Sequence, residues 1–339
     1  MSKQKRILIV RPDRIGDVVL STAIPREIRK TFPDAFVAVL VREYTQAIYF
    51  NNPNVDEIIL LENLSGNRLT DFFAAVKKIR VYKFSHALML LPNERINYLL
   101  FFAGIKTRVG VGRKFYQSIT LVKEVSRNKY IPLRHEADYC MDLTRRIGVK
   151  TDDIYPEIYL SENEKISIAK KKAELIGDKR FLIGIHSTSG NSAPNLKEEE
   201  YYRLLNELST ISNIAIAITD NKIPESFNNI DNIYFINKEK SLRDSIKNFA
   251  MLDLLISAST GPMHICSALK VRTLSLFCPL TACSPKLWGP LGNQNTTIIP
   301  YENYCKTQCP GNPKKCNFEG NSGINGKIIS QKINEIINV

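Results

Sequence analysis

Residues 6–25 read RILIVRPDRIGDVVLSTAIP, and they give the clearest indication of the fold class. An apolar run at Ile7–Val10 ends at Arg11, and after a turn that contains Gly16 the chain restarts as a helix at Asp17. A buried strand followed at once by a turn and a helix places the turn at the carboxyl edge of a parallel sheet. Open α/β sheets bind their ligands at that edge. Asp17 is therefore predicted to be a carboxylate at the head of a helix, facing a ligand cleft.

Short apolar runs alternate with longer segments of helical period as far as residue 147, and the alternation resumes at residue 181. This pattern is typical of doubly wound parallel sheets. Between the two regions lies a polar stretch with no clear period. We therefore expect a Rossmann-like domain over residues 1–155, a second over residues 156–325 and a last helix over residues 326–339. Two such α/β domains facing across a cleft suit a two-substrate enzyme.

The composition indicates a globular protein of 339 residues, 44% of them hydrophobic. Mean hydropathy is −0.17. No apolar run approaches the ~18 residues of a membrane helix, and the N-terminal run is shorter than the ~7–15 residues of a signal-peptide core, so a cytoplasmic location is expected. The net charge of +13 is uneven, because residues 1–150 hold 26 Lys and Arg against 14 Asp and Glu. Nucleic acid, an anionic membrane face or a phosphorylated substrate would suit this charge, and so would a solvated basic surface.

Two readings of Asp17 follow from its position. It could be an ordinary helix cap, as most aspartates after a turn are. It could also be a general base, since Gly16 permits close approach of a ligand and the helix dipole stabilises a carboxylate at a helix start. Its place after the first strand, with Asp13 and Arg14 beside it, favours the general base, which would remove a proton from an attacking hydroxyl.

Two loops of the second half combine small hydroxylated residues with glycine directly after a strand. Hydroxyls and backbone N–H groups in this arrangement can bind a phosphate, although each loop could equally be a polar helix cap. Neither loop is a Walker motif, and the first half has no GxGxxG, which disfavours a nicotinamide dehydrogenase. The helix that follows the second loop has a histidine in its first turn, and this histidine is expected to act as a neutral hydrogen-bonding group. The residues are Ser187, Thr188, Ser189 and Gly190 in the first loop, and Ser259, Thr260, Gly261 and His264 in the second.

A basic segment runs from Lys106 to Arg134 and has aromatic residues interleaved. It could bind nucleic acid by phosphate contact and stacking, or an anionic lipid head group. The apolar segment before it, residues 98–102, could touch a bilayer, but a buried core helix is the favoured interpretation. Three clustered cysteines near the C-terminus could bind zinc, but their spacing is not that of a standard finger, so free thiols are expected. They are Cys305, Cys309 and Cys316.

Taken together and in this order, three stretches resemble glycosyltransferase family nine, the ADP-heptose:lipopolysaccharide heptosyltransferases. They are RILIVRPDRIGDVVLSTAIP at the start, IGIHSTSGNSAPNLKEEEYYRLL at the start of the second half, and SASTGPMHICSAL followed by LFCPLTACSPKLWGP. The resemblance implies a GT-B fold of two Rossmann-like domains, with the last helix crossing back to the first. It also implies inverting sugar transfer without a metal or another cofactor.

The resemblance assigns roles to residues of this chain. Asp17 is implied to be the catalytic base. The first domain is implied to hold an anionic lipid A–core acceptor at the inner face of the cytoplasmic membrane, and the second to hold the nucleotide-sugar, ADP-heptose. No nucleic-acid partner is expected. The implied acceptor-binding residues are Arg14, Arg108, Arg113 and Lys114. The implied donor-binding residues are Ser187, Thr188, Ser189, Gly190, Ser259, Thr260, Gly261 and His264.

The chain departs from the family pattern in the loop after Thr188. Many members place there a lysine that meets the diphosphate, then a tryptophan, where this chain reads Ala193-Pro194-Asn195-Leu196. Lys197 lies one step past the tryptophan position, and Ser259 stands where some members carry an acid. The donor could therefore be a hexose or N-acetylhexosamine nucleotide for core or O-antigen synthesis. A nucleotide-sugar epimerase and a basic nucleic-acid-binding protein are the other hypotheses.

Overall fold

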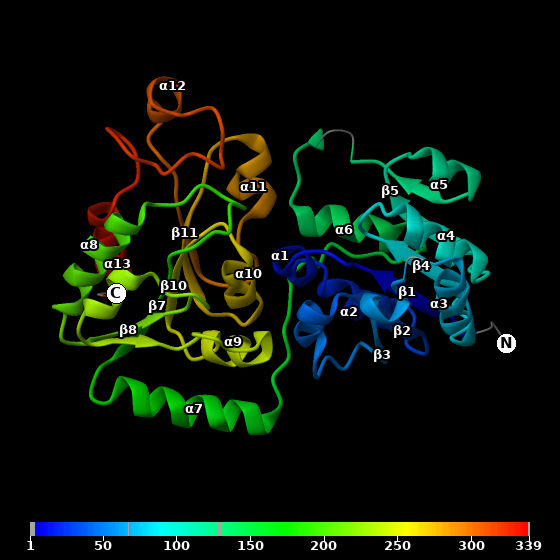
Figure 1. Ribbon diagram of the computed structural model, residues 1–339, viewed down its shortest axis with the longest axis horizontal. Coiled ribbons are helices and arrows are strands. Elements are labelled where there is room, and N and C mark those ends of the chain that lie inside the picture. The colour runs from blue at the N-terminus through cyan, green and yellow to red at the C-terminus, as the bar shows by residue number, and fades with distance from the viewer. Residues whose placement is uncertain (1–3, 67, 128–129, 338–339) are drawn as a thin grey trace. The chain divides into compact units, whose positions relative to one another are not determined.

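The computed structural model describes residues 4–66, 68–127 and 130–337, and the chain divides into two compact units, residues 1–159 and 160–339 (Figure 1). The division falls a few residues beyond the expected boundary. The acidic segment that follows the last helix of the first unit stays attached to that unit, because Arg26 pairs with Asp153 at 2.7 Å and with Glu157 at 2.6 Å.

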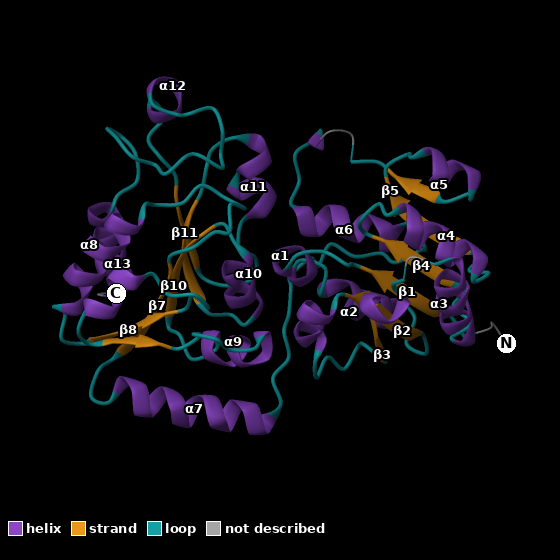
Figure 2. Cartoon of the chain, viewed as in Figure 1, coloured by secondary structure: helices purple, strands orange, loops and turns teal. Residues whose placement is uncertain are grey.

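The first unit is built on a six-stranded parallel sheet in the order β3-β2-β1-β4-β5-β6 (Figure 2). Its central strands are almost wholly apolar, as strands covered on both faces must be. The short outer strand β6 carries charged residues and was not expected from the sequence. The strands are β1 (Arg6–Val10), β2 (Phe36–Val41), β3 (Glu57–Leu60), β4 (His86–Met89), β5 (Thr107–Val111) and β6 (Lys123–Val125).

Helices cover both faces of this sheet. The helices α3, α4 and α5 follow β3, β4 and β5, and right-handed crossovers place them on one face, where Val76 and Leu99 pack with Leu8 of β1. The helices α1, α2 and α6 lie on the opposite face. The helices are α1 (Ile15–Val19), α2 (Ala23–Thr31), η1 (Glu43–Tyr49), η2 (Leu61–Leu64), α3 (Leu69–Val81), α4 (Glu94–Phe102), α5 (Phe115–Ile119) and α6 (Glu136–Arg145).

The helix expected from Asp17 to residue 31 is interrupted between α1 and α2. Ser21 and Thr22 donate side-chain hydrogen bonds to the carbonyls of Val18 and Val19, at 2.7 and 2.8 Å. Hydroxyls that bond to nearby carbonyls compete with the regular helical ladder. The result is a short first helix that begins at Ile15, so Asp17 lies in its first turn.

The second unit repeats the architecture, with a parallel sheet in the order β12-β11-β10-β7-β8-β9. The outer strand β12, polar on its surface, was again not expected. The strands are β7 (Phe181–His186), β8 (Ile214–Ile218), β9 (Ile233–Phe235), β10 (Leu254–Ala258), β11 (Arg272–Leu276) and β12 (Asn295–Ile298). The helices are α7 (Glu162–Ile176), α8 (Glu198–Ser209), η4 (Glu225–Asn229), α9 (Leu242–Phe249), α10 (Gly261–Ala268), η5 (Thr281–Cys283), α11 (Pro285–Trp288), α12 (Tyr304–Thr307) and α13 (Gly326–Ile337).

The last helix, α13, packs within the second unit. α13 packs against α8, and both lie in the second unit. Ile329 and Ile333 are fully buried there in one core with Leu204. Ser330 also donates to Glu207 of α8 at 2.6 Å. Because this packing buries the apolar side of α13, the helix belongs to the second unit.

Candidate functional site

Asp17 lies at the carboxyl edge of the first sheet, beside the point where the strand order reverses. β1 pairs with β2 on one side and β4 on the other, so the chain leaving β1 enters the crevice where open α/β sheets bind ligands. The helix cap is Arg14, not Asp17, and no side-chain hydrogen bond caps the helix. The capping interpretation of Asp17 is therefore wrong, and its carboxylate is available for another role.

A buried arginine holds the Asp17 carboxylate. The Arg11 guanidinium donates to Asp17 Oδ1 at 3.0 Å and to the Asp17 backbone carbonyl at 3.2 Å. It also donates to the carbonyl of Leu90, just after β4, at 3.2 Å. The Arg11 side chain is 2% exposed, whereas that of Asp17 is 23% exposed. The carboxylate is thus fixed from inside the protein while part of it faces solvent.

A second carboxylate, Glu136, completes this cluster, and the sequence analysis missed it. Glu136 stands in the first turn of α6 and is 2% exposed. It accepts two hydrogen bonds from Arg127, both at 2.9 Å, and one from Arg11 at 3.5 Å. Burial raises the pKa of the neighbouring Cys140 thiol to about 12, so this thiol stays protonated and donates to Glu136 at 3.6 Å. The available signal was an acid at the start of the helix that follows the basic segment.

The environment of Asp17 suits a general base. Burial raises its pKa from 3.8 to about 6, against the opposing effect of the Arg11 guanidinium; Asp13 and Glu136 raise it further. The helix dipole was expected to favour the ionised form of Asp17, which would lower its pKa, but the pKa is raised. A base whose pKa lies near neutral pH accepts a proton more readily than an ordinary aspartate and is still ionised at pH 7.

The four basic residues expected to bind the acceptor have different environments. Arg108 is 6% exposed and donates to the carbonyls of Ile105 and Thr120 inside the fold, so it is a structural residue. Arg14 is exposed next to Asp17. Arg113 and Lys114 are exposed after β5, with Arg113 paired to Glu124 at 3.1 Å. Three of the four are therefore accessible.

In the second unit the two hydroxyl-rich loops lie next to each other. The first follows β7 and the second follows β10, and these strands are paired. The sheet order reverses between β7 and β10, so the two loops flank the crevice at which open α/β sheets bind their ligands.

The first polar groups of the loop after β7 already donate hydrogen bonds to a buried carboxylate. Asp220 is fully buried and accepts hydrogen bonds from the backbone N–H and hydroxyl groups of Ser187 and Thr188, at 2.7 to 3.0 Å. These donors therefore shape the loop and are not directed at a phosphate. Asp220 was missed by the sequence analysis, although a polar pair directly after the buried strand β8 was a usable signal.

The remaining candidates of the second unit lie further along the two loops. Gly190 is exposed and has φ of +53°, a conformation that favours glycine. Thr260 caps α10 and Gly261 begins it, so the backbone N–H groups of this helix start can meet an anion. Ser259 is half-buried beside them, and His264 is 4% exposed, inside the helix packing.

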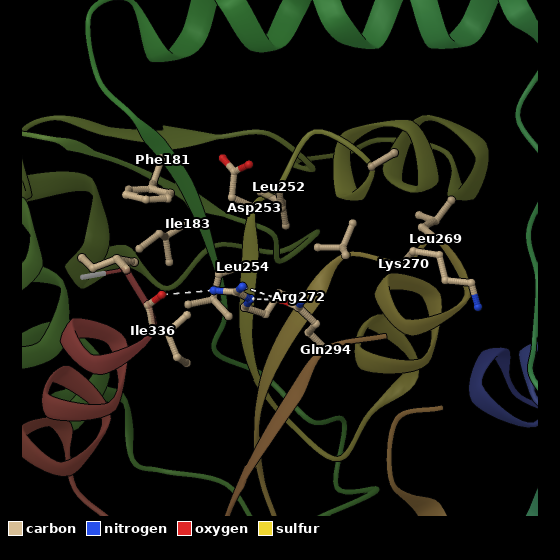
Figure 3. Close-up of a pocket in the computed structure, with 13 residues that line it drawn as sticks. Phe181, Ile183, Leu252, Asp253, Leu254, Leu269, Lys270, Arg272, Gln294 and Ile336 are labelled. Atoms are coloured by element: carbon tan, nitrogen blue, oxygen red, sulfur yellow. Dashed lines mark hydrogen bonds between the residues drawn. The ribbon is translucent and has the colours of Figure 1, made fainter. Parts of the chain in front are cut away.

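A hollow of about 440 Å³ in the second unit lies away from these loops (Figure 3). Its lining includes Phe181, Leu254 and Arg272, which begin β7, β10 and β11. It therefore opens at the amino edge of the sheet, opposite to the crevice. Arg272 donates across it to the carbonyl of Ile336 at 3.1 Å.

The clustered cysteines are free thiols. Cys316 is buried against the Tyr304 hydroxyl at 3.7 Å. Within residues 4–66, 68–127 and 130–337, no three His, Cys, Asp or Glu side chains are grouped so that they could hold a metal ion. In the same ranges, no helix has the length and hydropathy needed to cross a bilayer.

Comparison with known proteins gives one consistent family. The family model described as glycosyltransferase family 9 (heptosyltransferase) matches residues 73–315. A putative glycosyltransferase of Haemophilus influenzae is 25% identical, over 87% of this chain and 88% of its own. Lipopolysaccharide heptosyltransferase 2 of Escherichia coli K12 is 21% identical, over 89% and 90%. The crystal structure of a family 9 glycosyl transferase from Veillonella parvula, 20% identical, superposes with a TM-score of 0.78 over 98% of this chain and 97% of its own.

Proposed function

The chain belongs to glycosyltransferase family 9, the heptosyltransferases, and from that premise we propose that it transfers heptose from ADP-heptose to the inner core of lipopolysaccharide. The protein is a glycosyltransferase with a GT-B-like fold. The proposal also specifies that the donor is ADP-heptose and that the acceptor is an anionic lipid A–core. It places the enzyme at the cytoplasmic face of the inner membrane. It further holds that transfer inverts the anomeric centre and needs no metal.

The observation that carries the proposal is the Asp17 carboxylate, held by Arg11 at the crevice of the first sheet and partly exposed. In the proposed step this carboxylate takes the proton of an acceptor hydroxyl. The acceptor oxygen attacks the anomeric carbon as the bond from that carbon to the diphosphate breaks. The nucleoside diphosphate leaves with the bonding electrons, and attack from the opposite side inverts the centre. The raised pKa of Asp17 supports this role.

The diphosphate is proposed to bind at the crevice of the second unit. The start of α10 at Thr260 and Gly261 presents backbone N–H groups, which stabilise the negative charge that grows on the leaving group. The half-buried Ser189 and the exposed Gly190 are proposed to contribute from the other loop. Ser187 and Thr188 are proposed to act indirectly, by giving that loop its shape through Asp220.

A transferase for another nucleotide-sugar is the second candidate, and the position of Lys197 favours it. Many family members place a lysine against the diphosphate in this loop. Here that position holds no lysine, and Lys197, one step past the tryptophan position, pairs with Glu319 at 2.6 Å. The ammonium group of Lys197 is therefore paired with a carboxylate, and the family's usual lysine contact to the diphosphate is missing from this loop. The leading proposal and this candidate share the fold and the base, and differ in the donor.

A thermal-shift panel of ADP-, UDP-, GDP- and CMP-sugars separates the two donors. A ligand that binds the native state raises stability by RT ln(1 + [L]/Kd). ADP-heptose is expected to raise the melting temperature most, and chelation of divalent metal is expected to leave transfer to a lipid A–core acceptor unchanged. A shift with UDP-sugars alone would overturn the donor. Turnover of a nucleotide-sugar with no acceptor present would indicate an epimerase.

A further inference from the structure

The positive charge of the first unit is concentrated in one part of its sequence. Residues 68–123 hold eleven Lys and Arg against two Asp and Glu, whereas residues 1–67 hold nine against eight and residues 124–159 hold six against seven. The segment 68–123 contains α3, α4 and α5, which share one face of the sheet (Figure 1). Six of the eleven basic residues lie in these helices or directly before them, and the other five lie in the turns and strands that connect or follow them.

Ten of these eleven basic side chains are exposed; the exception is the buried Arg108. Exposed cations spread over one face create a positive potential that attracts an anionic surface. The exposed residues are Arg68, Lys77, Lys78, Arg80, Lys83, Arg95, Lys106, Arg113, Lys114 and Lys123.

The same layer also exposes large apolar side chains. Leu69 and Phe115, at the starts of α3 and α5, are 78% and 82% exposed. Single exposed apolar residues are common on protein surfaces, but here seven lie on three adjacent helices and an eighth follows α5. The set is Leu69, Phe73, Val81, Phe101, Phe102, Phe115, Ile119 and Leu121, and together with the ten cations it is called the basic-apolar face.

Aromatic packing connects α3 and α4 beneath this face. The ring of Phe102 lies 6.0 Å from that of Phe72 and 6.3 Å from that of Phe73. The Arg80 guanidinium donates to the Phe102 carbonyl, which ties the ends of the helices together. The exposed rings are thus held in place by the fold. Within the segment 98–102, Leu99 and Leu100 are buried in the core, as the favoured interpretation expected, whereas Phe101 and Phe102 are exposed.

A recess of about 620 Å³ opens on the basic-apolar face where α3 and α4 begin. Leu69, Phe72 and Phe102 give it an apolar lining, and Arg68 and Arg95 stand among the lining residues. Guanidinium groups pair with phosphate while apolar side chains accept hydrocarbon. This combination matches the boundary between the head groups and the acyl chains of a bilayer.

We propose that the basic-apolar face of α3, α4 and α5 docks the protein on an anionic lipid bilayer. The cations meet the phosphates of the head groups, and the exposed Leu and Phe side chains enter the boundary of the acyl region. Nucleic acid would satisfy the cations but would leave Leu69, Ile119 and Leu121 without an apolar partner. The inference deepens the proposed function, because it names the surface that brings the enzyme to a lipid-linked acceptor.

Flotation of the full chain with lipid vesicles tests the proposal without donor or acceptor. Vesicles of phosphatidylglycerol and phosphatidylethanolamine are expected to bind the protein at low salt, and neutral phosphatidylcholine vesicles to bind it at least tenfold more weakly. The variant Lys77→Gln/Lys106→Gln is expected to reduce partition to the anionic vesicles about tenfold or more, since each cation near such a surface contributes about fivefold.

A second variant, Leu69→Ser/Phe115→Ser, tests the apolar part at positions exposed enough to leave the fold intact. It is expected to reduce binding most at high salt, where the electrostatic part is screened. The matched control Ile166→Ser/Lys170→Gln alters exposed residues of α7 in the second unit and is expected to bind like the wild type. Melting curves of all variants confirm folding.

Equal binding of the wild type to neutral and anionic vesicles would overturn the proposal, as would equal losses in the test and control variants. Binding of single-stranded RNA without binding of vesicles would assign the face to nucleic acid instead. Sugar transfer to a detergent-dispersed acceptor is measured separately, so a protein that transfers sugar but ignores vesicles refutes only the docking surface.

Discussion

At the scale of single residues, the chemistry depends on how the buried Arg11 and the partly buried Arg127 distribute their charge. Arg11 bridges Asp17 and Glu136, and Arg127 pairs with Glu136. Glu136 therefore balances much of the buried positive charge, which leaves Asp17 free to gain and lose a proton near neutral pH.

Asp17→Asn is expected to lower transfer by a factor of about 10² to 10⁴, the usual contribution of a general base, and to leave donor affinity unchanged. For the wild type, kcat/KM is expected to rise with pH and level off above about pH 6, because the base must be deprotonated and its pKa is raised from 3.8 to about 6. The measurement is a pH profile from 5 to 8. In Asp17→Asn this rising limb is expected to disappear, and its persistence would assign the base to another residue.

Glu136→Gln is expected to destabilise the protein by about 3 kcal/mol, since it leaves the buried Arg11 and the partly buried Arg127 guanidinium groups without their shared carboxylate. The measurement is urea unfolding. Glu124→Gln is the matched control: it removes an exposed partner of Arg113, and surface pairs contribute about 0 to 1 kcal/mol. Equal effects of the two substitutions would contradict the structural role assigned to Glu136.

At the scale of elements, the sequence predicted the strands of both sheets and the loops that follow them, because buried parallel strands are continuous apolar runs. It missed the outer strands β6 and β12, whose polar residues give no such signal. It also missed the break after α1, where the hydroxyls of Ser21 and Thr22 compete with the helix. Glu136 and Asp220 escaped prediction because their partners come from other elements, which only the fold brings near them.

Asp220→Ala tests whether the residue that follows β8 fixes the conformation of the loop after β7. Asp220, after β8, holds the loop after β7 through four hydrogen bonds. Its removal leaves the N–H groups of Ser187 and Thr188 without their acceptor, at a cost of about 3 kcal/mol. Donor affinity measured by calorimetry is expected to fall at least tenfold. Asp231→Ala, at an exposed position, is expected to leave both quantities unchanged, and an unaltered affinity in Asp220→Ala would exclude this loop from the donor site.

At the scale of the whole molecule, the two structural units differ less in net charge than the two halves of the sequence do. Residues 1–159 hold 26 Lys and Arg against 17 Asp and Glu, and residues 160–339 hold 21 against 17. The acidic residues 152–157 belong to the first unit, where Asp153 and Glu157 neutralise Arg26. The remaining excess of the first unit lies in the segment 68–123, so the basic character is a property of that segment.

Each unit has its own sheet and its own buried core, and α13 completes the core of the second. Residues 160–339 expressed alone are therefore expected to fold, and to bind the nucleotide-sugar with a Kd within about tenfold of that of the full chain, a difference of about 1.4 kcal/mol. Circular dichroism checks folding, and calorimetry with ADP-heptose measures affinity. A second fragment that ends at residue 325, without α13, is expected to unfold, because it loses Ile329 and Ile333 from the core. A folded fragment 160–339 that binds no nucleotide-sugar would mean that donor binding requires residues of the first unit.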